Sequence, residues 1–167
     1  MTVRLHRICS TPIGPVGIAW EKMRGRFVIR EIRLPGTRAA KRIPAGTCTE
    51  VARVARRIVA LLEGEAVRFP LSLVDFGTLP PFTRAVLRAT HRIPRGQTRT
   101  YAQVAAAVGS PGAARAAGNA LAANTVPLIV PCHRVVKSGG ALGGFQGKAA
   151  NTLKRCLLEI EGALAES

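Results

Sequence analysis

The sequence predicts an α+β fold, in which an antiparallel sheet with one helix is followed by a helical second half. Residues 1–34 alternate short apolar runs with turn residues, a pattern typical of antiparallel strands. From about residue 80, apolar positions recur at helical spacing between Gly and Pro residues. A chain of 167 residues can hold one or two small domains with a core, and we expect two, residues 1–75 and residues 76–167.

Three strands are predicted at the start of the chain, over residues 3–8, 16–20 and 27–34. The segment Thr11–Pro15 is rich in proline and glycine and indicates a turn between the first two strands. Together these strands predict an antiparallel meander.

One helix and a short strand are predicted to complete the first domain. The segment Thr47–Glu50 has the spacing of a capping box, and the helix that it begins ends near Gly64. The segment Phe69–Val74 is predicted to be a strand, and its proline places that strand at a sheet edge. The apolar residues on one face of the helix are Val51, Val54, Ala55, Ile58, Leu61 and Leu62.

The second domain is predicted to begin with a helix from Pro80 to about Arg92 and to end with an amphipathic helix from about Ala149 to Ala163. Between them, the apolar run Val126–Val130 predicts a buried strand that leads to Cys132.

A helix-turn-helix motif is predicted in the middle of the second domain. Thr100 and Gln103 form a capping box, which starts a helix that ends at Gly109. Ser110 and Pro111 are expected to begin the next helix at once, because proline is favoured at the first helical position. Two helices joined by so short a turn are typical of this motif.

Basic residues are concentrated in the second domain. The formal net charge is +16, and residues 76–158 contain eight Arg and three Lys but neither Asp nor Glu. A segregated positive charge attracts polyanions, of which nucleic acid is the obvious one. The alternative is that the charge serves solubility alone, although such a charge need not be segregated.

The apolar runs are shorter than a membrane span requires, and the first residues lack the apolar stretch of a signal peptide. We therefore expect an intracellular, cytoplasmic protein with no membrane association, in which thiols are reduced.

The second helix of the motif, predicted over residues 111–123, consists almost entirely of small side chains around one arginine. One interpretation is close packing against another helix in the core. However, Arg115 and Asn119 lie four residues apart, which gives the helix a polar face. A narrow DNA minor groove would accept such a helix better than a bulky one.

The four cysteines do not include a C-x-x-C pair, so no zinc site is predicted. Cys156 lies at helical spacing from apolar residues and is expected in the core. Cys9 and Cys48 have no chemical partners in sequence, and they are either free thiols or a disulfide.

Cys132 is the candidate nucleophile, because it directly precedes His133. A thiol needs an adjacent base or a lowered pKa to react at neutral pH, and a base of this kind needs an acid to orient it. Residues 76–158 hold no acid, so Glu161 on the final helix is the candidate third member, rather than Glu159. From spacing alone, a structural Cys-His pair in the core stays open as an alternative.

The segment Val126–Val136, with Pro-Cys-His-Arg-Val at its centre, resembles the active-site motif of the O6-alkylguanine-DNA alkyltransferases. The resemblance is specific in the second domain and looser in the first. It implies a ribonuclease H-like first domain and a winged helix-turn-helix in the second. The other segments that match in order and spacing are Ser10–Pro15, Gly96–Tyr101, Ala113–Ala116, Asn124 and Leu157–Gly162.

The resemblance implies single-turnover DNA repair. The Cys132 thiolate would take an alkyl group from O6 of guanine, or from O4 of thymine, after the damaged base has flipped into a pocket. A water would link Cys132 to His133, and Glu161 would hold that histidine. Tyr101 would give a proton to guanine N3, and Asn124 would brace the turn before the active-site strand. No metal or organic cofactor is implied, because the damaged DNA is itself the alkyl donor.

The implied partner is double-stranded DNA, which the helix over 111–123 would bind in the minor groove, with the protein acting as a monomer. Arg115 would take the place of the flipped base. The other residues expected at the DNA are Ala114, Gly118, Asn119 and Thr100, and those expected in the substrate pocket are Val135, Phe145 and Gln146. The family often has Tyr-Ser where this chain has Phe145-Gln146, so the range of accepted alkyl groups stays open.

Two other functions are compatible with parts of the sequence. A damage sensor or a winged-helix regulator would bind DNA without transfer, but sensors of this kind replace the reactive cysteine, which this chain retains as Cys132. A thiol hydrolase would need an oxyanion site, and no further motif indicates one.

Overall fold

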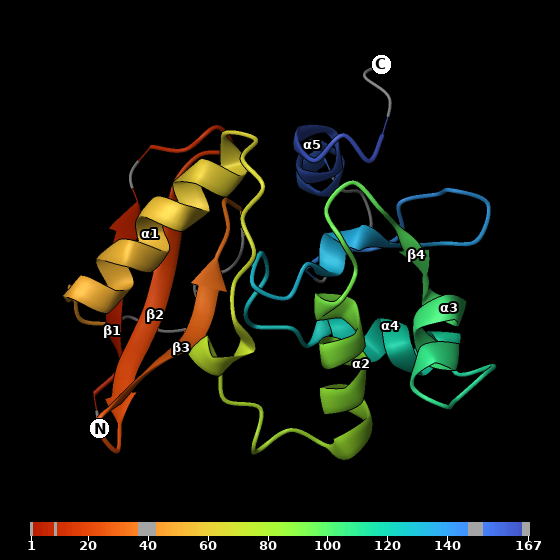
Figure 1. Ribbon diagram of the computed structural model, residues 1–167, viewed down its shortest axis with the longest axis horizontal. Helices are drawn as coiled ribbons and strands as arrows, with labels where there is room; N and C mark the ends of the chain where they lie inside the picture. Colours follow the sequence, from red (N-terminus) through yellow and green to blue (C-terminus); the bar gives the residue numbers. More distant parts are fainter. Residues whose placement is uncertain (1, 9, 37–42, 147–151, 165–167) are drawn as a thin grey trace. The chain divides into compact units, whose positions relative to one another are not determined.

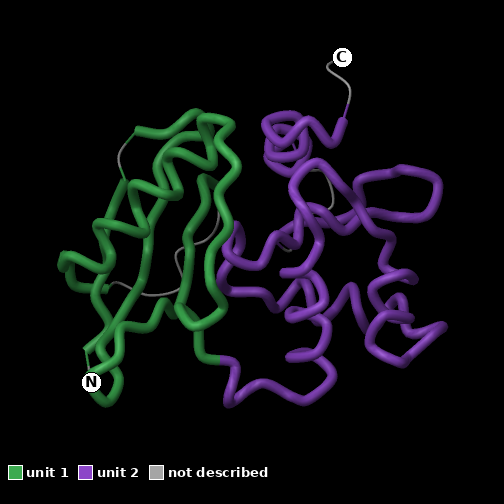
Figure 2. The backbone as a smooth tube through the Cα atoms, viewed as in Figure 1, with its two compact units in different colours: residues 1–75 green, residues 76–167 purple. Residues whose placement is uncertain are grey.

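The computed structural model describes residues 2–8, 10–36, 43–146 and 152–164. The chain divides into two compact units, residues 1–75 and residues 76–167 (Figure 2). Within the described ranges, no helix combines the length and the apolar character needed to cross a membrane.

The first unit contains an antiparallel three-stranded sheet in the order β1-β2-β3, so the predicted meander is confirmed (Figure 1). Its strands are β1 (Arg4–Ile8), β2 (Val16–Met23) and β3 (Arg26–Arg33). Leu5 pairs with Ala19, and a bulge follows at Ala19/Trp20. The helix α1 (Thr49–Leu62) packs on the sheet, and the six apolar residues predicted on its inner face are all buried.

Two local predictions in the first unit are wrong. The helix α1 begins after Cys48, whose side chain makes no capping hydrogen bond, so Thr47 lies one residue too early to form a capping box. Residues 69–74 do not form a strand. Pro70 lacks an N–H donor and its carbonyl accepts from Leu73 N, which produces the 3₁₀ turn η1 (Leu71–Leu73). Only Val74 forms a bridge, to Ile29 of β3.

The second unit is mainly helical, with a two-stranded parallel sheet. The capping box at Thr100 is confirmed, because its side chain accepts from Gln103 N at 3.1 Å and its N–H donates to Gln103 Oε1 at 2.8 Å. The elements are α2 (Pro81–His91), β4 (Arg99–Thr100), α3 (Tyr101–Ala107), α4 (Ala114–Ala122), η2 (Cys132–Arg134), β5 (Val135–Val136) and α5 (Thr152–Ile160).

The helix expected from Pro111 begins three residues later, at Ala114. Gly112 has φ = 87°, a left-handed conformation that interrupts any helix, and Ala113 N donates to Ser110 O in a turn. The consecutive helices α3 and α4 nevertheless pack against each other, as a helix-turn-helix requires.

The strand expected before Cys132 is also absent. Residues 126–130 form a loop with a single bridge between Pro127 and Val130, and Leu128 has φ = 72°. Pro127 and Pro131 have no N–H to donate, so a regular ladder cannot continue through them. Cys132 consequently begins the short helix η2.

The final helix ends at Ile160, three residues before the predicted end at Ala163. After Ile160, Gly162 adopts φ = 70°, and Ala163 N donates to Leu158 O at 2.8 Å, which closes the helix through a glycine cap. The predicted start near Ala149 lies outside the described residues.

Candidate active site around Cys132

Cys132 lies at a cavity of about 480 Å³ in the second unit, a size typical of small-molecule sites. The cysteine is 5% exposed. Helices α3 and α4 supply one side of the cavity, and the loop after β5 supplies the other. The lining residues are Tyr101, Ala102, Ala114, Arg115, Gly118, Asn119, Leu121, Ala122, Cys132, Lys137, Ser138, Gly144, Phe145 and Gln146.

Asn124 fixes the position of the sulfur. Its Nδ2 donates to Cys132 Sγ at 3.2 Å and to Val130 O at 3.1 Å, and its Oδ1 accepts from Val126 N at 3.1 Å. The side chain is thus bonded across the loop that replaces the predicted strand. We expected Asn124 to brace this turn, and the structure also brings it into contact with the sulfur.

Burial raises the pKa of the Cys132 thiol, because the thiolate is less well solvated inside the protein. Three side chains oppose this shift. Hydrogen bonds from the amides of Asn124 and Gln146 and the positive charge of Lys154 all favour the thiolate. The sulfur is therefore a buried thiol surrounded by groups that stabilise its ionised form.

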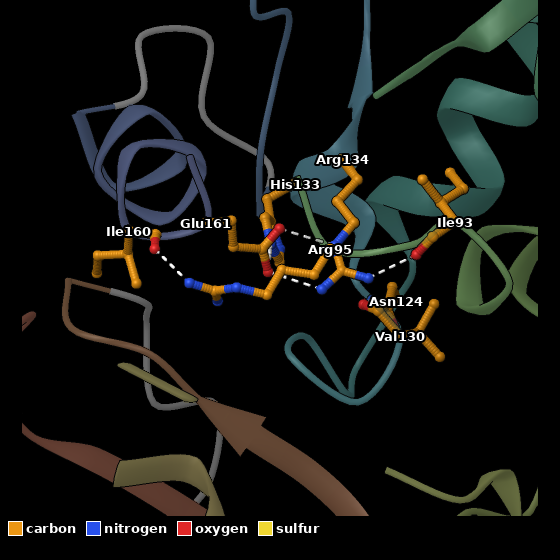
Figure 3. A network of polar contacts seen from close by, with 8 residues as sticks. All are labelled: Ile93, Arg95, Asn124, Val130, His133, Arg134, Ile160 and Glu161. Carbon is orange, nitrogen blue, oxygen red and sulfur yellow. Dashed lines mark hydrogen bonds and ion pairs between the residues drawn. The ribbon is translucent and has the colours of Figure 1, made fainter. Parts of the chain in front are cut away.

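His133 and Glu161 are brought together as the sequence predicts. His133 Nε2 lies 3.0 Å from Glu161 Oε1, and both side chains are 1% exposed (Figure 3). Arg134 binds the same carboxylate with two nitrogens, Nε to Oε2 at 2.8 Å and Nη2 to Oε1 at 2.7 Å. This bidentate geometry holds the carboxylate in one orientation.

These contacts decide the protonation of the histidine. Burial alone would raise the pKa of Glu161, but hydrogen bonds from His133 and Arg134 outweigh it and lower the pKa to about 2. Burial lowers the pKa of His133, although Glu161 acts in the opposite direction. A neutral imidazole facing a carboxylate must donate from Nε2, which leaves Nδ1 unprotonated. Nδ1 is buried and has no hydrogen-bond partner among the described residues.

A second pair of contacts anchors this network to the loop after α2. Arg134 Nη1 donates to Ile93 O at 2.5 Å, and Arg95 Nη2 donates to Ile160 O at 2.6 Å (Figure 3). The carbonyl of Ile160 belongs to the last residue of α5, so Arg95 holds the chain immediately before Glu161.

The sequence interpretation missed Arg134 and Lys154 as site residues. Lys154 is 0% exposed, and its Nζ donates to Val135 O at 2.6 Å and to Gly144 O at 3.2 Å. Burial lowers the pKa of Lys154 to about 8. One feature of the sequence could have indicated Lys154. It lies three and four residues before Leu157 and Leu158, which places a lysine on the apolar face of α5.

Tyr101, Phe145 and Val135 were also predicted at the site, and they differ in their contacts and in whether they line the cavity. Tyr101 Oη donates to Gly144 O at 3.4 Å, and burial raises the pKa of its phenol. Phe145 lines the cavity and packs edge-on against the His133 ring, with centroids 6.4 Å apart. Val135 is fully buried and does not line the cavity, and its carbonyl accepts from Lys154.

The residues expected to contact DNA gather at the mouth of the same cavity, with one exception. Arg115 is exposed on α4, and Ala114, Gly118 and Asn119 line the cavity beside it. Thr100 does not line it and serves as the α3 cap. Ala117 and Ala120 of α4 do not line the cavity and are buried, so small residues also provide the core packing considered above.

The described residues contain no group of three or more His, Cys, Asp or Glu side chains that could hold a metal ion. Cys48, Cys132 and Cys156 are free thiols, and Cys9 lies outside the described residues. Cys156 is half-buried, so its expected place in the core is wrong: it lies at the margin of the apolar face of α5.

Comparisons with known proteins identify relatives of this chain. Residues 81–163 match the family model described as 6-O-methylguanine DNA methyltransferase, DNA binding domain. The methylated-DNA–protein-cysteine methyltransferase of Methanothermobacter thermautotrophicus is 48% identical over 105 residues, which are 63% of this chain and 57% of that protein. The constitutive methyltransferase of Bacillus subtilis is 37% identical over 158 residues, covering 93% of this chain and 94% of that protein.

Solved structures resemble the whole chain. The OGT protein of Mycobacterium tuberculosis, in a crystal structure in complex with DNA, superposes with a TM-score of 0.79 at 34% identity, covering 96% of this chain and 94% of that one. The O6-methylguanine-DNA methyltransferase of Pyrococcus kodakaraensis superposes with a TM-score of 0.67 at 21% identity, over 96% of this chain and 99% of that one, and this likeness concerns the fold alone.

Proposed function

Because the chain belongs to the family of methylated-DNA–protein-cysteine methyltransferases, we propose that it repairs DNA by direct reversal, transferring an alkyl group from O6 of guanine, or from O4 of thymine, to Cys132. The observation that carries the proposal is the buried chain of contacts from Arg134 through Glu161 to His133, next to a thiol that lines a cavity. These contacts orient the imidazole of the residue that directly follows the nucleophile in the chain.

Deprotonation of Cys132 is the first proposed step. The Glu161 carboxylate accepts a hydrogen bond from the Nε2–H of His133, so Nδ1 has a free lone pair inside the protein. A water between Sγ and Nδ1 carries the thiol proton to the histidine. The amides on the sulfur and the Lys154 ammonium stabilise the resulting thiolate.

Alkyl transfer follows as one displacement. Cys132 Sγ forms a bond to the alkyl carbon while the bond from that carbon to O6 breaks, and the electron pair stays with the guanine. Tyr101 gives a proton to the guanine as charge develops, because its raised pKa keeps the phenol protonated. The proton that His133 took from the thiol then passes through solvent to the Tyr101 phenolate. The phenol is thereby regenerated and the reaction balances. The product is a thioether, so each molecule reacts once.

The second unit supplies both DNA binding and chemistry in this proposal. Helices α3 and α4, together with the strands β4 and β5, act as a winged helix-turn-helix, with α4 in the minor groove of double-stranded DNA and the protein acting as a monomer. Arg115 fills the gap that the flipped base leaves, and the base enters the cavity beside Cys132. The first unit acts as a ribonuclease H-like amino-terminal domain. We propose a cytoplasmic, nucleoid-associated location, which a DNA substrate favours.

The test is incubation with a duplex that carries one O6-methylguanine, followed by mass analysis of the peptide that contains Cys132. We expect one methyl group to replace the thiol hydrogen, with one equivalent transferred per protein molecule. A duplex with undamaged guanine is the matched control.

The Cys132→Ala variant should bind the same duplex and transfer nothing. An unmodified Cys132 in the wild-type protein, with binding retained, would instead indicate a damage sensor. Equal transfer by the variant would assign the chemistry to another residue.

A further inference from the structure

The α2–β4 turn, residues 93–97, contacts the end of α5 directly beside Glu161. Arg95 Nη2 donates to Ile160 O at 2.6 Å, and Ile160 is the last residue of α5 (Figure 3). A Cβ atom at Gly96 would lie 3.4 Å from Glu161 O, so the backbone of the turn packs against the backbone that carries the carboxylate. The turn therefore contacts the part of the chain on which the relay depends.

The shape of the turn depends on its glycine. Gln97 N donates to Pro94 O at 3.2 Å, and Gly96 has φ = 76° at the third of these four positions. A type II β-turn needs a positive φ at that position, which glycine adopts without strain. The turn can thus place Arg95 against α5 while the two backbones stay close.

Arg95 supplies a hydrogen bond that α5 cannot make for itself. The last carbonyls of a helix have no partner within it, and the helix dipole favours a cation at this end. In the described span of α5, the last turn holds no basic residue of its own. Ile160 O and Glu161 N belong to one planar peptide group, so the bond from Arg95 holds the peptide group that leads into Glu161.

The same turn also contacts the arginine that binds the carboxylate. Arg134 Nη1 donates to Ile93 O at 2.5 Å, while its other nitrogens bind Glu161. The backbone before Glu161 and the partner of its side chain are consequently anchored to one short segment.

We propose that Arg95 is a positioning residue for the transfer reaction, which keeps the Glu161 carboxylate against His133 by holding the end of α5. This inference rests on the proposed function. Arg95 does not line the cavity around Cys132, so its influence on the sulfur passes through Glu161 and His133.

The experiment measures single-turnover methyl transfer from the free base O6-methylguanine, from about pH 7 to about pH 10, a range that spans the ionisation of an ordinary thiol. The free base needs no DNA binding, so the loss of a positive charge cannot act through affinity for DNA. Wild type is compared with Arg95→Met, which removes the donor and the charge, and with Arg95→Lys, which keeps a charged donor. Arg92→Met, at an exposed position outside the cavity, is the charge-matched control.

At pH 7 we expect Arg95→Met to react about tenfold more slowly than wild type, a fraction of what a general base contributes. An imidazole that Glu161 no longer holds is a poorer base. Arg95→Lys should recover most of the rate, and Arg92→Met should match wild type. As the pH rises, the thiol loses its proton to solvent without the histidine, so the ratio of the Arg95→Met rate to the wild-type rate should rise towards one.

Taking this ratio at each pH removes the contributions of the other groups at the site. Arg134 and Lys154 carry charge near His133, and Lys154 and the Tyr101 phenol lie near Cys132. All of them are present in every variant. A loss of folded protein would lower the ratio equally at every pH, so a rising ratio identifies an effect on proton transfer.

An Arg95→Met rate equal to that of wild type at pH 7, or a loss that is the same at every pH, would overturn the inference. An equal loss in Arg92→Met would also overturn it, because the effect would then be one of charge alone. The proposed function would survive both results, since the wild type would still transfer methyl to Cys132. An absence of transfer in the wild type, from the duplex and from the free base, would overturn the proposed function together with this inference.

Discussion

Glu161 stays ionised inside the second unit because it accepts hydrogen bonds from His133 and from two nitrogens of Arg134. A buried carboxylate of this kind is costly unless its oxygens are satisfied. Its charge therefore makes the local structure sensitive to acid. The same charge keeps the proton of His133 on Nε2.

Acid should weaken the folded state through Glu161. The pKa of this carboxyl falls from 4.5 to about 2 in the folded protein, so its contribution is present above pH 4.5 and is lost as the pH falls towards 2. We expect Glu161→Gln to reduce the difference in unfolding free energy between pH 6 and pH 3 by about 2 kcal/mol. Urea denaturation at both pH values measures this. Glu63→Gln, at the exposed end of α1, should leave the difference unchanged.

Lys154 should control how readily Cys132 ionises. Its ammonium favours the Cys132 thiolate, so its removal should raise the pKa of the thiol further. We expect the pH midpoint for the reaction of Cys132 with iodoacetamide to move upwards in Lys154→Met and to stay nearer to wild type in Lys154→Arg. An equal midpoint in all three proteins would show that Lys154 only supports the loop.

At the scale of secondary structure, α3 depends on its amino-terminal cap. Thr100 and Gln103 satisfy each other's backbone N–H groups. We expect Thr100→Ala to lower the unfolding free energy by about 1 kcal/mol. Thermal or urea unfolding measures the loss, and Thr98→Ala, two residues before the cap, is the control that should change stability by less than about 0.5 kcal/mol.

Arg115 on α4 has a role in the proposed reaction, and the folding of the protein does not depend on it. Arg115 is exposed, so Arg115→Ala should change the unfolding free energy by less than about 0.5 kcal/mol. Methyl transfer from duplex DNA should slow by about tenfold or more, because the flipped state loses its replacement partner. Transfer from the free base O6-methylguanine, which needs no flipping, should be unaffected. An equal loss with both substrates would contradict the proposed role.

The sequence predicted elements well where a periodic apolar face alone defines them. The meander and the inner face of α1 are examples. It failed where prolines and glycines decide the path of the backbone: Pro70 replaces a strand with a 3₁₀ turn, Gly112 delays α4, and two prolines turn the expected strand before Cys132 into a loop.

The candidate site was predicted in its reactive members but not in the groups that support them. Cys132, His133 and Glu161 follow from residue types and from the scarcity of acids, and the resemblance to a known family strengthens them. Arg134 could not be found in this way, because an arginine in a basic segment has no distinguishing pattern. The only signal for Lys154 was its place on the apolar face of α5. The structure shows that the side chains of both residues are buried.

Across the whole molecule, the segregated positive charge should make DNA binding depend on salt. Residues 76–158 carry eleven basic groups and no acid. We expect the logarithm of the affinity for duplex DNA to fall linearly with the logarithm of salt concentration, with a slope of about −0.9 for each phosphate contacted. Lys137→Gln, at the exposed rim of the cavity, should reduce the slope by about one contact, measured by fluorescence anisotropy. Arg53→Gln on α1 serves as the comparison, and equal changes in both variants would contradict this assignment.

The order in which the chain is synthesised bears on when the thiol becomes reactive. His133 meets its carboxylate 28 residues further along, and Arg95 meets the carbonyl of Ile160 across 65 residues. A growing chain on the ribosome therefore carries Cys132 and His133 before Glu161, which orients the histidine, has been synthesised. The contacts that hold His133 can therefore form only after the last helix of the chain has been synthesised.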